Sequence, residues 1–186
     1  MPDGMSRHWE PETVFTIGHS THTIEEFVDI LKAYEIGTLV DIRTVPRSRH
    51  NPQFGQDALM QSMESAGIAY RYMKDLGGLR KARKDSPNMG WQNLSFRGYA
   101  DYMQTEPFRI AIDELVALGT RSRSAIMCAE ALPWRCHRSL VGDALLVRHI
   151  PVEDIMLAQK SSPHKLTNFA RVRGTQILYP PETVET

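Results

Sequence analysis

Several side chains that can do chemistry lie close together in one short segment. The segment contains Cys128, Glu130, Cys136, His137 and Arg138, the last three at the start of a predicted helix. The free N–H groups at a helix N-terminus attract anions and lower the pKa of a thiol placed there. The segment therefore predicts an anion site, a reactive Cys136 thiolate, or both. The alternative is that Cys136 is a small buried side chain whose neighbours only cap the helix in solvent.

Polar residues also end two apolar runs that are typical of buried strands. His19 and Ser20 follow the first run, residues 14–18, and Asp41 and Arg43 end the second, residues 38–43. The carboxyl ends of parallel strands meet at one edge of a sheet, where ligands bind. We therefore expect these residues to share one cleft with Glu130 and Cys136.

The hydrophobic periodicity along the chain predicts alternating strands and helices. Strands are expected over residues 14–18, 38–43, 68–73, 124–130 and 152–158, followed by a small hairpin around Gly174. Helices are expected from a cap at Thr21 or Thr23 to about Tyr34, then over residues 57–66, 99–118 with a break near Pro107, and 136–147. This order predicts an α/β fold: a single domain with a mainly parallel sheet flanked by helices, in a Rossmann-like three-layer arrangement.

The predicted α/β domain covers residues 14–180, between an N-terminal arm (1–13) and a C-terminal tail (181–186). Inside the domain, residues 75–98 form a long polar stretch with a glycine pair and a basic run. A loop of this length in a compact domain is often functional, which favours a lid or a binding loop. The alternative is a mobile surface loop without a role.

The charge balance limits the partners of the chain. Lys plus Arg and Asp plus Glu both number 22, so the formal net charge is zero. This balance argues against a broad surface for long nucleic acids, while small nucleotides stay open. The first residues have no apolar run typical of a signal peptide, and no segment reaches the length of a membrane span. With its two cysteines, the sequence indicates a cytoplasmic protein with reduced thiols and no membrane partner.

Five segments together resemble the family named for domain of unknown function 488. They are GHS (18–20), DIRTVPRSR (41–49), LGG (76–78), SFRGYADYM (95–103) and MCAEALPWRCHRSL (127–140). The resemblance runs from about residue 14 to residue 179, in the family's order. It implies a compact α/β domain with the same cleft. It implies no reaction, because the family is named for lacking one.

The hypothesis that the sequence favours is an enzyme acting on a phosphate-bearing substrate, a nucleotide or a nucleic acid. Ser20, Arg43, Arg47 and Arg138 would bind this substrate. His19, Asp41, Glu130, Cys136 and His137 would form the catalytic set, with a carboxylate as base and an imidazole as acid. Trp91, Phe96 and Tyr99 could stack a base.

Three alternatives stay open, and with them the question of whether the protein is an enzyme. A Cys136 thiolate could attack a disulfide, a sulfur donor or a phosphate, although no arginine has the spacing that the protein-tyrosine-phosphatase loop requires. A divalent metal, zinc or iron, could bind to Cys128, Cys136, His137 and His19, with Glu130 as an extra ligand. A non-catalytic domain could bind a small anion or a partner, with Asp41 and Glu130 in structural ion pairs.

Overall fold

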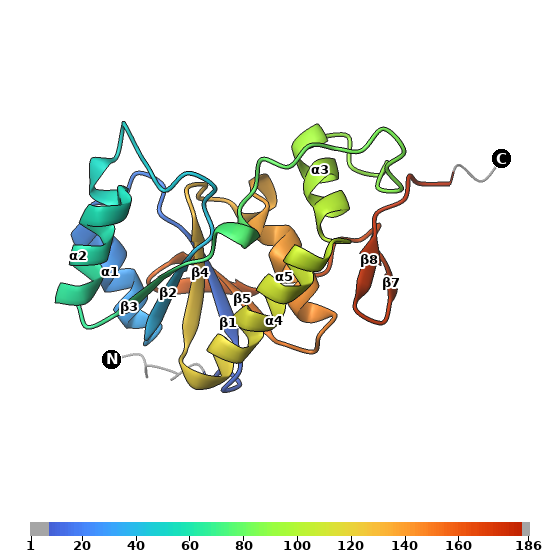
Figure 1. Ribbon diagram of the computed structural model, residues 1–186. Coiled ribbons are helices and arrows are strands. Elements are labelled where there is room, and N and C mark those ends of the chain that lie inside the picture. Colours follow the sequence, from blue (N-terminus) through green and yellow to red (C-terminus); the bar gives the residue numbers. More distant parts are fainter. Residues whose placement is uncertain (1–7, 184–186) are drawn as a thin grey trace.

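A six-stranded sheet runs through the centre of the molecule (Figure 1). The structure is a computed structural model that describes residues 8–183. The strands are β1 (Val14–Gly18), β2 (Thr38–Asp41), β3 (Ala69–Tyr72), β4 (Ser124–Cys128), β5 (Val152–Leu157) and β6 (Lys160–Pro163). Their order is β3-β2-β4-β1-β5-β6. The first five strands pair in parallel and β6 pairs antiparallel with β5, which confirms the predicted mainly parallel sheet.

Helices cover both faces of this sheet, which confirms the three-layer arrangement (Figure 1). The α-helices are α1 (Ile24–Ala33), α2 (Gln56–Ser65), α3 (Leu94–Tyr102), α4 (Glu106–Arg121) and α5 (Arg138–Leu146). Three short 3-10 helices are η1 (Pro52–Phe54), η2 (Lys74–Leu76) and η3 (Pro133–Arg135). Buried residues of α1 and α2 pack on one face of the sheet, and those of α3, α4 and α5 pack on the other.

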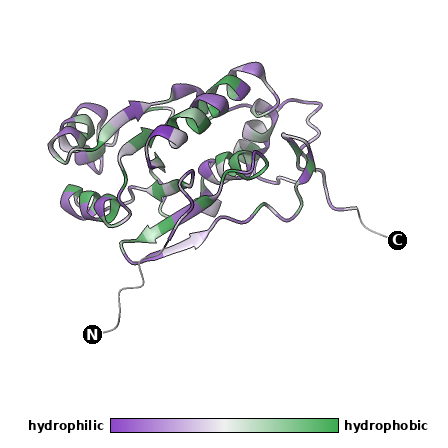
Figure 2. Cartoon of the chain, turned by 90° about the horizontal axis from the view of Figure 1, so that it is seen from below, coloured by the Kyte–Doolittle hydropathy of each residue, from purple (hydrophilic) through white to green (hydrophobic). Residues whose placement is uncertain are grey.

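Side chains alternate between the two faces along each strand, as strand geometry requires. In β1, Phe15 and Ile17 join the core beneath α1 and α2, whereas Val14 joins the core beneath α4 and α5. In β4, Met127 faces the first core and Ile126 the second. The helices turn hydrophobic residues toward the sheet from both sides (Figure 2). This alternation decides on which face each polar residue at a strand end lies.

Most predicted elements form within a few residues of the expected bounds, with two instructive differences. The predicted break near Pro107 is confirmed, since α3 ends at Tyr102 and α4 begins at Glu106 with Pro107 in its first turn, where proline is tolerated; α3 starts earlier than predicted because Asn93 caps it. Strand β6 was not predicted because it consists of a lysine, two serines and a proline, without any apolar run. It covers β5, which is therefore not the edge of the sheet.

The beginning of α1 settles which threonine caps it. Thr23 accepts a hydrogen bond from the backbone of Glu26, and the Glu26 carboxylate accepts one from the backbone of Thr23. This reciprocal pair is a capping box, and it confirms Thr23 rather than Thr21 as the cap.

The predicted arm and tail lie partly outside the described residues, since positions 1–7 and 184–186 are not described. In the described part of the arm, Trp9 packs edge-on against Phe15. Toward the other end, β7 (Arg171–Arg173) and β8 (Gln176–Leu178) pair as the predicted hairpin. The turn uses Gly174 at φ 61°, a conformation that glycine adopts without strain.

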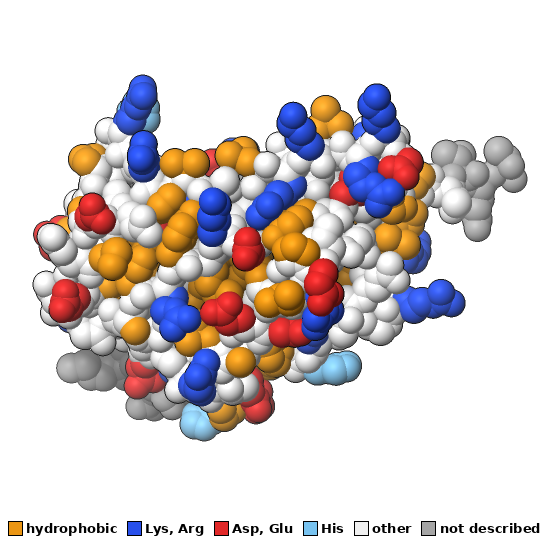
Figure 3. Space-filling model, viewed as in Figure 1, with side chains coloured by type: hydrophobic (Ala, Val, Ile, Leu, Met, Phe, Trp, Pro, Cys, Tyr) orange, Lys and Arg blue, Asp and Glu red, His pale blue; other side chains and the backbone are white. Residues whose placement is uncertain are grey.

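Charged side chains are spread over the surface rather than collected in one broad patch. On the face seen in Figure 3, Lys and Arg side chains stand along the upper rim, with acidic and apolar groups interspersed below them. In the described part of the chain, no helix combines the length and the apolar character needed to cross a membrane. The carboxyl ends of the parallel strands point to the same rim in Figure 1.

Candidate functional site

A cavity of about 430 Å³ opens at the carboxyl ends of β2 and β4. Its walls come from the loops that follow β2, β3 and β4 and from the start of α3, and both thiols line it. We call it the dithiol cavity. A larger hollow of about 590 Å³ lies between α1 and α2, but no cysteine or histidine lines it. The chemistry predicted from the sequence is therefore concentrated in the dithiol cavity, at the sheet edge where α/β folds bind ligands.

The two cysteines lie side by side in this cavity. Cys128 is the last residue of β4 and faces α5, because strand alternation places it on the same side as Ile126. Cys136 follows η3, just before α5 begins. Their Sγ atoms are 2.8 Å apart, and both residues are buried. Both are free thiols.

Arg138 holds the Cys128 sulfur in place. Its Nη1 donates to Cys128 Sγ at 2.7 Å, and the same guanidinium donates to the backbone carbonyls of Glu130 and Ala131. Arg138 is fully buried, so this positive charge acts on the sulfur with little solvent screening. Burial by itself would raise the pKa of the Cys128 thiol, but the hydrogen bond from Cys136 and the charge of Arg138 outweigh it and lower the pKa to about 7.

Cys136 shows the opposite shift. Its hydrogen bond to Cys128, together with burial, raises the pKa of the Cys136 thiol. The backbone N–H of Arg138 at the start of the helix lowers the pKa of this thiol, as expected, but the hydrogen bond to Cys128 and burial outweigh it. The backbone N–H of Arg138 does point at Cys136 Sγ, at 3.5 Å, but a second negative charge beside the Cys128 thiolate costs more than that contact returns. The Arg138 guanidinium and the hydrogen bond from Cys136 thus favour the thiolate form of Cys128 over that of Cys136.

His137 completes the group with a defined tautomer. Its Nε2 lies 3.1 Å from the carbonyl oxygen of Ile42, which can only accept, so Nε2 carries the proton. Burial lowers the pKa of His137 to about 4, which keeps the ring neutral near pH 7. The unprotonated Nδ1 then faces Cys136 Sγ at 3.5 Å. His137 is accordingly a neutral neighbour of the Cys136 thiol.

Two glycines let the backbone approach these residues closely. A Cβ on Gly18 would lie 1.7 Å from the carbonyl oxygen of Glu130, so only glycine allows the loop after β4 to cross β1 there. A Cβ on Gly78 would lie 3.0 Å from Nδ1 of His137 and would crowd its ring. These contacts give a physical reason for a glycine in each of the GHS and LGG segments.

The family model of "Domain of unknown function DUF488" matches residues 23–145, which include both thiols, His137 and Arg138. The chain belongs to the DUF488 family. The DUF488 match is shorter than the resemblance expected over residues 14 to 179, and it leaves out Gly18 and β5. No curated protein and no solved structure matches the chain. DUF488 is described without a reaction, so function has to be argued from the site itself.

Two of the residues expected in the cleft lie on the other face of the sheet. His19 stacks on Phe54 with ring centroids 4.3 Å apart, and burial lowers its pKa. Asp41 accepts hydrogen bonds from Nε and Nη2 of Arg43 at 2.9 and 2.7 Å and from the hydroxyl of Tyr70 at 2.6 Å. Neither His19 nor Asp41 lines the dithiol cavity. The Asp41 carboxylate forms a buried ion pair with Arg43.

The remaining predicted residues divide between the cavity and its supports. Glu130 and Arg47 line the dithiol cavity and are exposed, and Arg43 lines it while its guanidinium is held by Asp41. Ser20 lies outside the cavity at φ 47°, and its backbone N–H donates to the carbonyl of Ala129. Arg138 does not line the cavity either, because it is buried beneath the loop after β4. The predicted segment thus lines the cavity, but Arg138, which was expected to contact the substrate, is buried.

The long loop is described throughout and is held against α3. The carboxylate of Asp101 accepts from the hydroxyl of Ser86, the amide of Asn88 and the backbone of Arg83. The guanidinium of Arg80 packs 3.7 Å from the ring centroid of Tyr102. Gly78, Leu79, Asn93, Ser95 and Phe96 line the dithiol cavity. The loop and the start of α3 therefore form one wall of the cavity.

The aromatic residues expected to stack a base are engaged with other rings. Trp91 stacks on Phe96 with centroids 4.9 Å apart and meets Phe169 edge-on at 4.8 Å. Tyr99 is buried and donates its hydroxyl to the carbonyl of Leu76. Of the three residues expected to stack, only Phe96 lines the dithiol cavity.

The four residues that the sequence offered as metal ligands, Cys128, Cys136, His137 and His19, do not come together in one place. His19 lies on the face opposite Cys128, so the four expected nitrogen and sulfur ligands do not converge. Within residues 8–183, no group of three or more His, Cys, Asp or Glu residues is arranged to hold a metal ion.

Proposed function

We propose that this protein catalyses thiol–disulfide exchange, with Cys128 as the nucleophile and Cys136 as the resolving thiol. The observation that carries the proposal is the 2.8 Å approach of the two sulfurs beside a buried arginine. A thiolate, not a thiol, attacks sulfur, and a nucleophile whose pKa lies near ambient pH combines a high thiolate fraction with good reactivity. With a pKa of about 7, Cys128 meets that condition.

The first step is attack of the Cys128 thiolate on a substrate disulfide, R–S–S–R′. A bond forms between Cys128 Sγ and one substrate sulfur, the substrate S–S bond breaks, and R′–S⁻ leaves. The exposed Arg47 and Arg135, which line the dithiol cavity, attract a leaving group or substrate tail with negative charge.

The second step is resolution by Cys136. Cys136 Sγ attacks Cys128 Sγ, the bond between Cys128 and the substrate breaks, and R–S⁻ leaves and takes up the Cys136 proton. The neutral His137 ring, with Nδ1 3.5 Å from Cys136 Sγ, lies beside the attacking thiol. The product is an internal disulfide, and a dithiol reductant from outside the protein restores the two thiols.

The stoichiometry of a chromogenic aromatic disulfide tests this function. The reduced wild-type protein should release two equivalents of aromatic thiolate and end with an internal disulfide. Cys136→Ser should release one equivalent and retain the other aryl group on Cys128. Cys128→Ser should react at least tenfold more slowly. Equal rates in Cys128→Ser and the wild type would exclude Cys128 as the nucleophile.

A second candidate function is binding of a phosphate-bearing ligand in the same cavity, as the sequence hypothesis favours. It is supported by Arg47 and Arg135, which line the cavity and form no ion pair among residues 8–183. The test is a thermal-shift titration with inorganic phosphate and nucleotides. A rise in Tm that disappears in Arg47→Ala and Arg135→Ala supports this function, and no rise contradicts it.

A further inference from the structure

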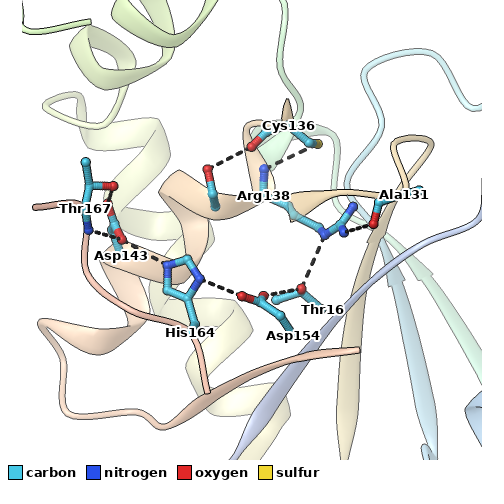
Figure 4. A network of polar contacts seen from close by, with 9 residues as sticks. Thr16, Ala131, Cys136, Arg138, Asp143, Asp154, His164 and Thr167 are labelled. Atoms are coloured by element: carbon cyan, nitrogen blue, oxygen red, sulfur yellow. Dashed lines mark hydrogen bonds and ion pairs between the residues drawn. The ribbon is translucent and has the colours of Figure 1, made fainter. Parts of the chain in front are cut away.

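We infer that Thr16 is a positioning residue for the Cys128 thiolate, acting through Arg138 and held in turn by Asp154 and His164. This inference rests on the proposed function, because it assigns a role in setting the reactivity of the proposed nucleophile. The residues concerned lie in β1, β5 and the segment after β6, outside the dithiol cavity (Figure 4).

The direction of the first hydrogen bonds follows from the chemistry of the groups. Arg138 Nε can only donate, and it lies 3.3 Å from Thr16 Oγ1. Thr16 therefore accepts from Arg138 and donates its own proton to Asp154 Oδ1, at 2.6 Å. Donation to a carboxylate strengthens the hydroxyl oxygen as an acceptor, because neighbouring hydrogen bonds polarise one another. Thr16 thus connects a buried cation to a buried carboxylate.

Asp154 is itself held by a histidine that carries a charge. His164 Nδ1 lies 3.0 Å from Asp154 Oδ2, and its Nε2 lies 3.0 Å from Asp143 Oδ1. Both partners are carboxylates, so both ring nitrogens donate and the ring is an imidazolium. Although burial lowers the pKa of His164, the hydrogen bonds to Asp143 and Asp154 raise it to about 9.

Asp143, at the other end of this network from Cys128, is also held by hydrogen bonds. Thr167 and Tyr179 donate their hydroxyls to Asp143 Oδ2 at 2.7 and 2.9 Å. A Cβ on Gly142 would lie 2.8 Å from Nε2 of His164, so this glycine gives the imidazolium its place beside α5. The series of contacts from Asp143 to Cys128 therefore leaves Arg138 one orientation, the one that directs Nη1 at the sulfur.

The position of Thr16 in its strand supports a role beyond packing. All other residues of β1 are apolar or glycine, and the whole strand is buried. A buried hydroxyl has to be hydrogen-bonded, and an apolar residue of the same shape would fill this place at lower cost if no partner required it. Thr16 is thus the polar contact that β1 makes to the guanidinium.

Thr16→Val tests the inference, because valine has the shape of threonine without the hydroxyl. The apparent pKa of Cys128, read from alkylation rate against pH with mass spectrometry to assign the site, should rise by about one unit. At pH 7 that shift lowers alkylation about fivefold. Thr16→Ser, which keeps the hydroxyl, should retain the wild-type pKa. Thr38→Val is the matched control, since Thr38 is a buried strand threonine bonded to Ser122 and remote from the thiols.

Other charges near Cys128 are unchanged in these variants. The titratable and charged groups around it are Arg138, Cys136 and His137, with Arg43, Arg47, Glu130 and Arg135 in the cavity walls. If Thr16→Val does not fold, Thr16→Ala removes the same hydroxyl without changing any charge, and the pKa of Cys128 should again rise.

Several outcomes would overturn the inference. An unchanged Cys128 pKa in a folded Thr16→Val protein, or in folded Thr16→Ala where it replaces that variant, means that Thr16 only supports the fold. The same rise in Thr38→Val would mean that the shift reports general loosening. Because alkylation needs no substrate turnover, these results stand even if the wild type fails to exchange disulfides, which would overturn the proposed function alone.

Discussion

The carbonyl oxygen of Glu130 occupies the space that a side chain on Gly18 would need, 1.7 Å from the position of its Cβ. This approach brings the loop after β4 over β1 and lets Arg138 reach the carbonyls of Glu130 and Ala131. The same guanidinium then donates to Cys128 Sγ. One glycine in the first strand is therefore linked to the electrostatics of a thiol at the end of the fourth.

Gly18→Ala should displace this loop. The clash is with backbone, which cannot rotate away, so overpacking should lower the free energy of unfolding by about 1–3 kcal/mol. Gly119→Ala is the control, because its Cβ would meet only a side-chain methyl of Val14, at 3.2 Å, and no backbone atom. Urea denaturation measures both variants, and equal stability of the two would contradict the proposed role of the close approach.

Arg138→Lys should weaken the Cys128 thiolate while keeping a positive charge. Lysine lacks the planar fork that donates to the sulfur and to two carbonyls at once. The pKa of Cys128 should rise by about one unit, which is about 1.4 kcal/mol of lost interaction. Arg135→Lys, exposed on the cavity wall, should leave the pKa unchanged. A thiol pKa that is equally unaffected by both substitutions would show that Arg138 does not stabilise the thiolate.

Asp41→Asn distinguishes a structural carboxylate from a catalytic one. The substitution leaves Arg43 buried without an opposite charge, which should cost about 3–5 kcal/mol of unfolding free energy. Asp57→Asn, at an exposed position in α2, should cost far less. Exchange with the aromatic disulfide should survive in folded Asp41→Asn. A stable variant that has lost the reaction would instead restore Asp41 to the catalytic set that the sequence predicted.

The His164 imidazolium should make stability depend on pH on the alkaline side. The pKa of His164 is raised from 6.5 to about 9 by folding, so its contribution is fully present below pH 6.5 and is lost as pH rises through 9. The Tm of the wild type should therefore fall between pH 7 and pH 10 by several degrees more than that of His164→Gln. Parallel curves for the two proteins would mean that the ring is not charged in the folded state.

Much of the fold could be predicted because local patterns and tertiary structure agree. Thr23 caps α1 with Glu26, and the apolar run of β1 is a fully buried strand, as their residue types indicate. Strand alternation also explains the misplaced residues. His19 has the parity of Phe15 and Ile17, so it lies on the α1 and α2 face, opposite Cys128. Counting residues within each strand would have separated these two sets.

Other features depend on contacts between distant segments. The lowered pKa of Cys128 follows from a buried arginine and a second sulfur, whereas the local rule for helix N-termini favours Cys136. The partners of Thr16 lie in α5 and β5, more than one hundred residues away. In the sequence near Thr16, its role is indicated only by a hydroxyl in an otherwise apolar strand.

The most direct test of the account is site-resolved alkylation of the reduced wild-type protein across pH 5–10. Cys128 should be labelled at least tenfold faster than Cys136 at pH 7, with an apparent pKa of about 7. Faster labelling of Cys136, or a Cys128 profile with the pKa of an ordinary thiol, would contradict it.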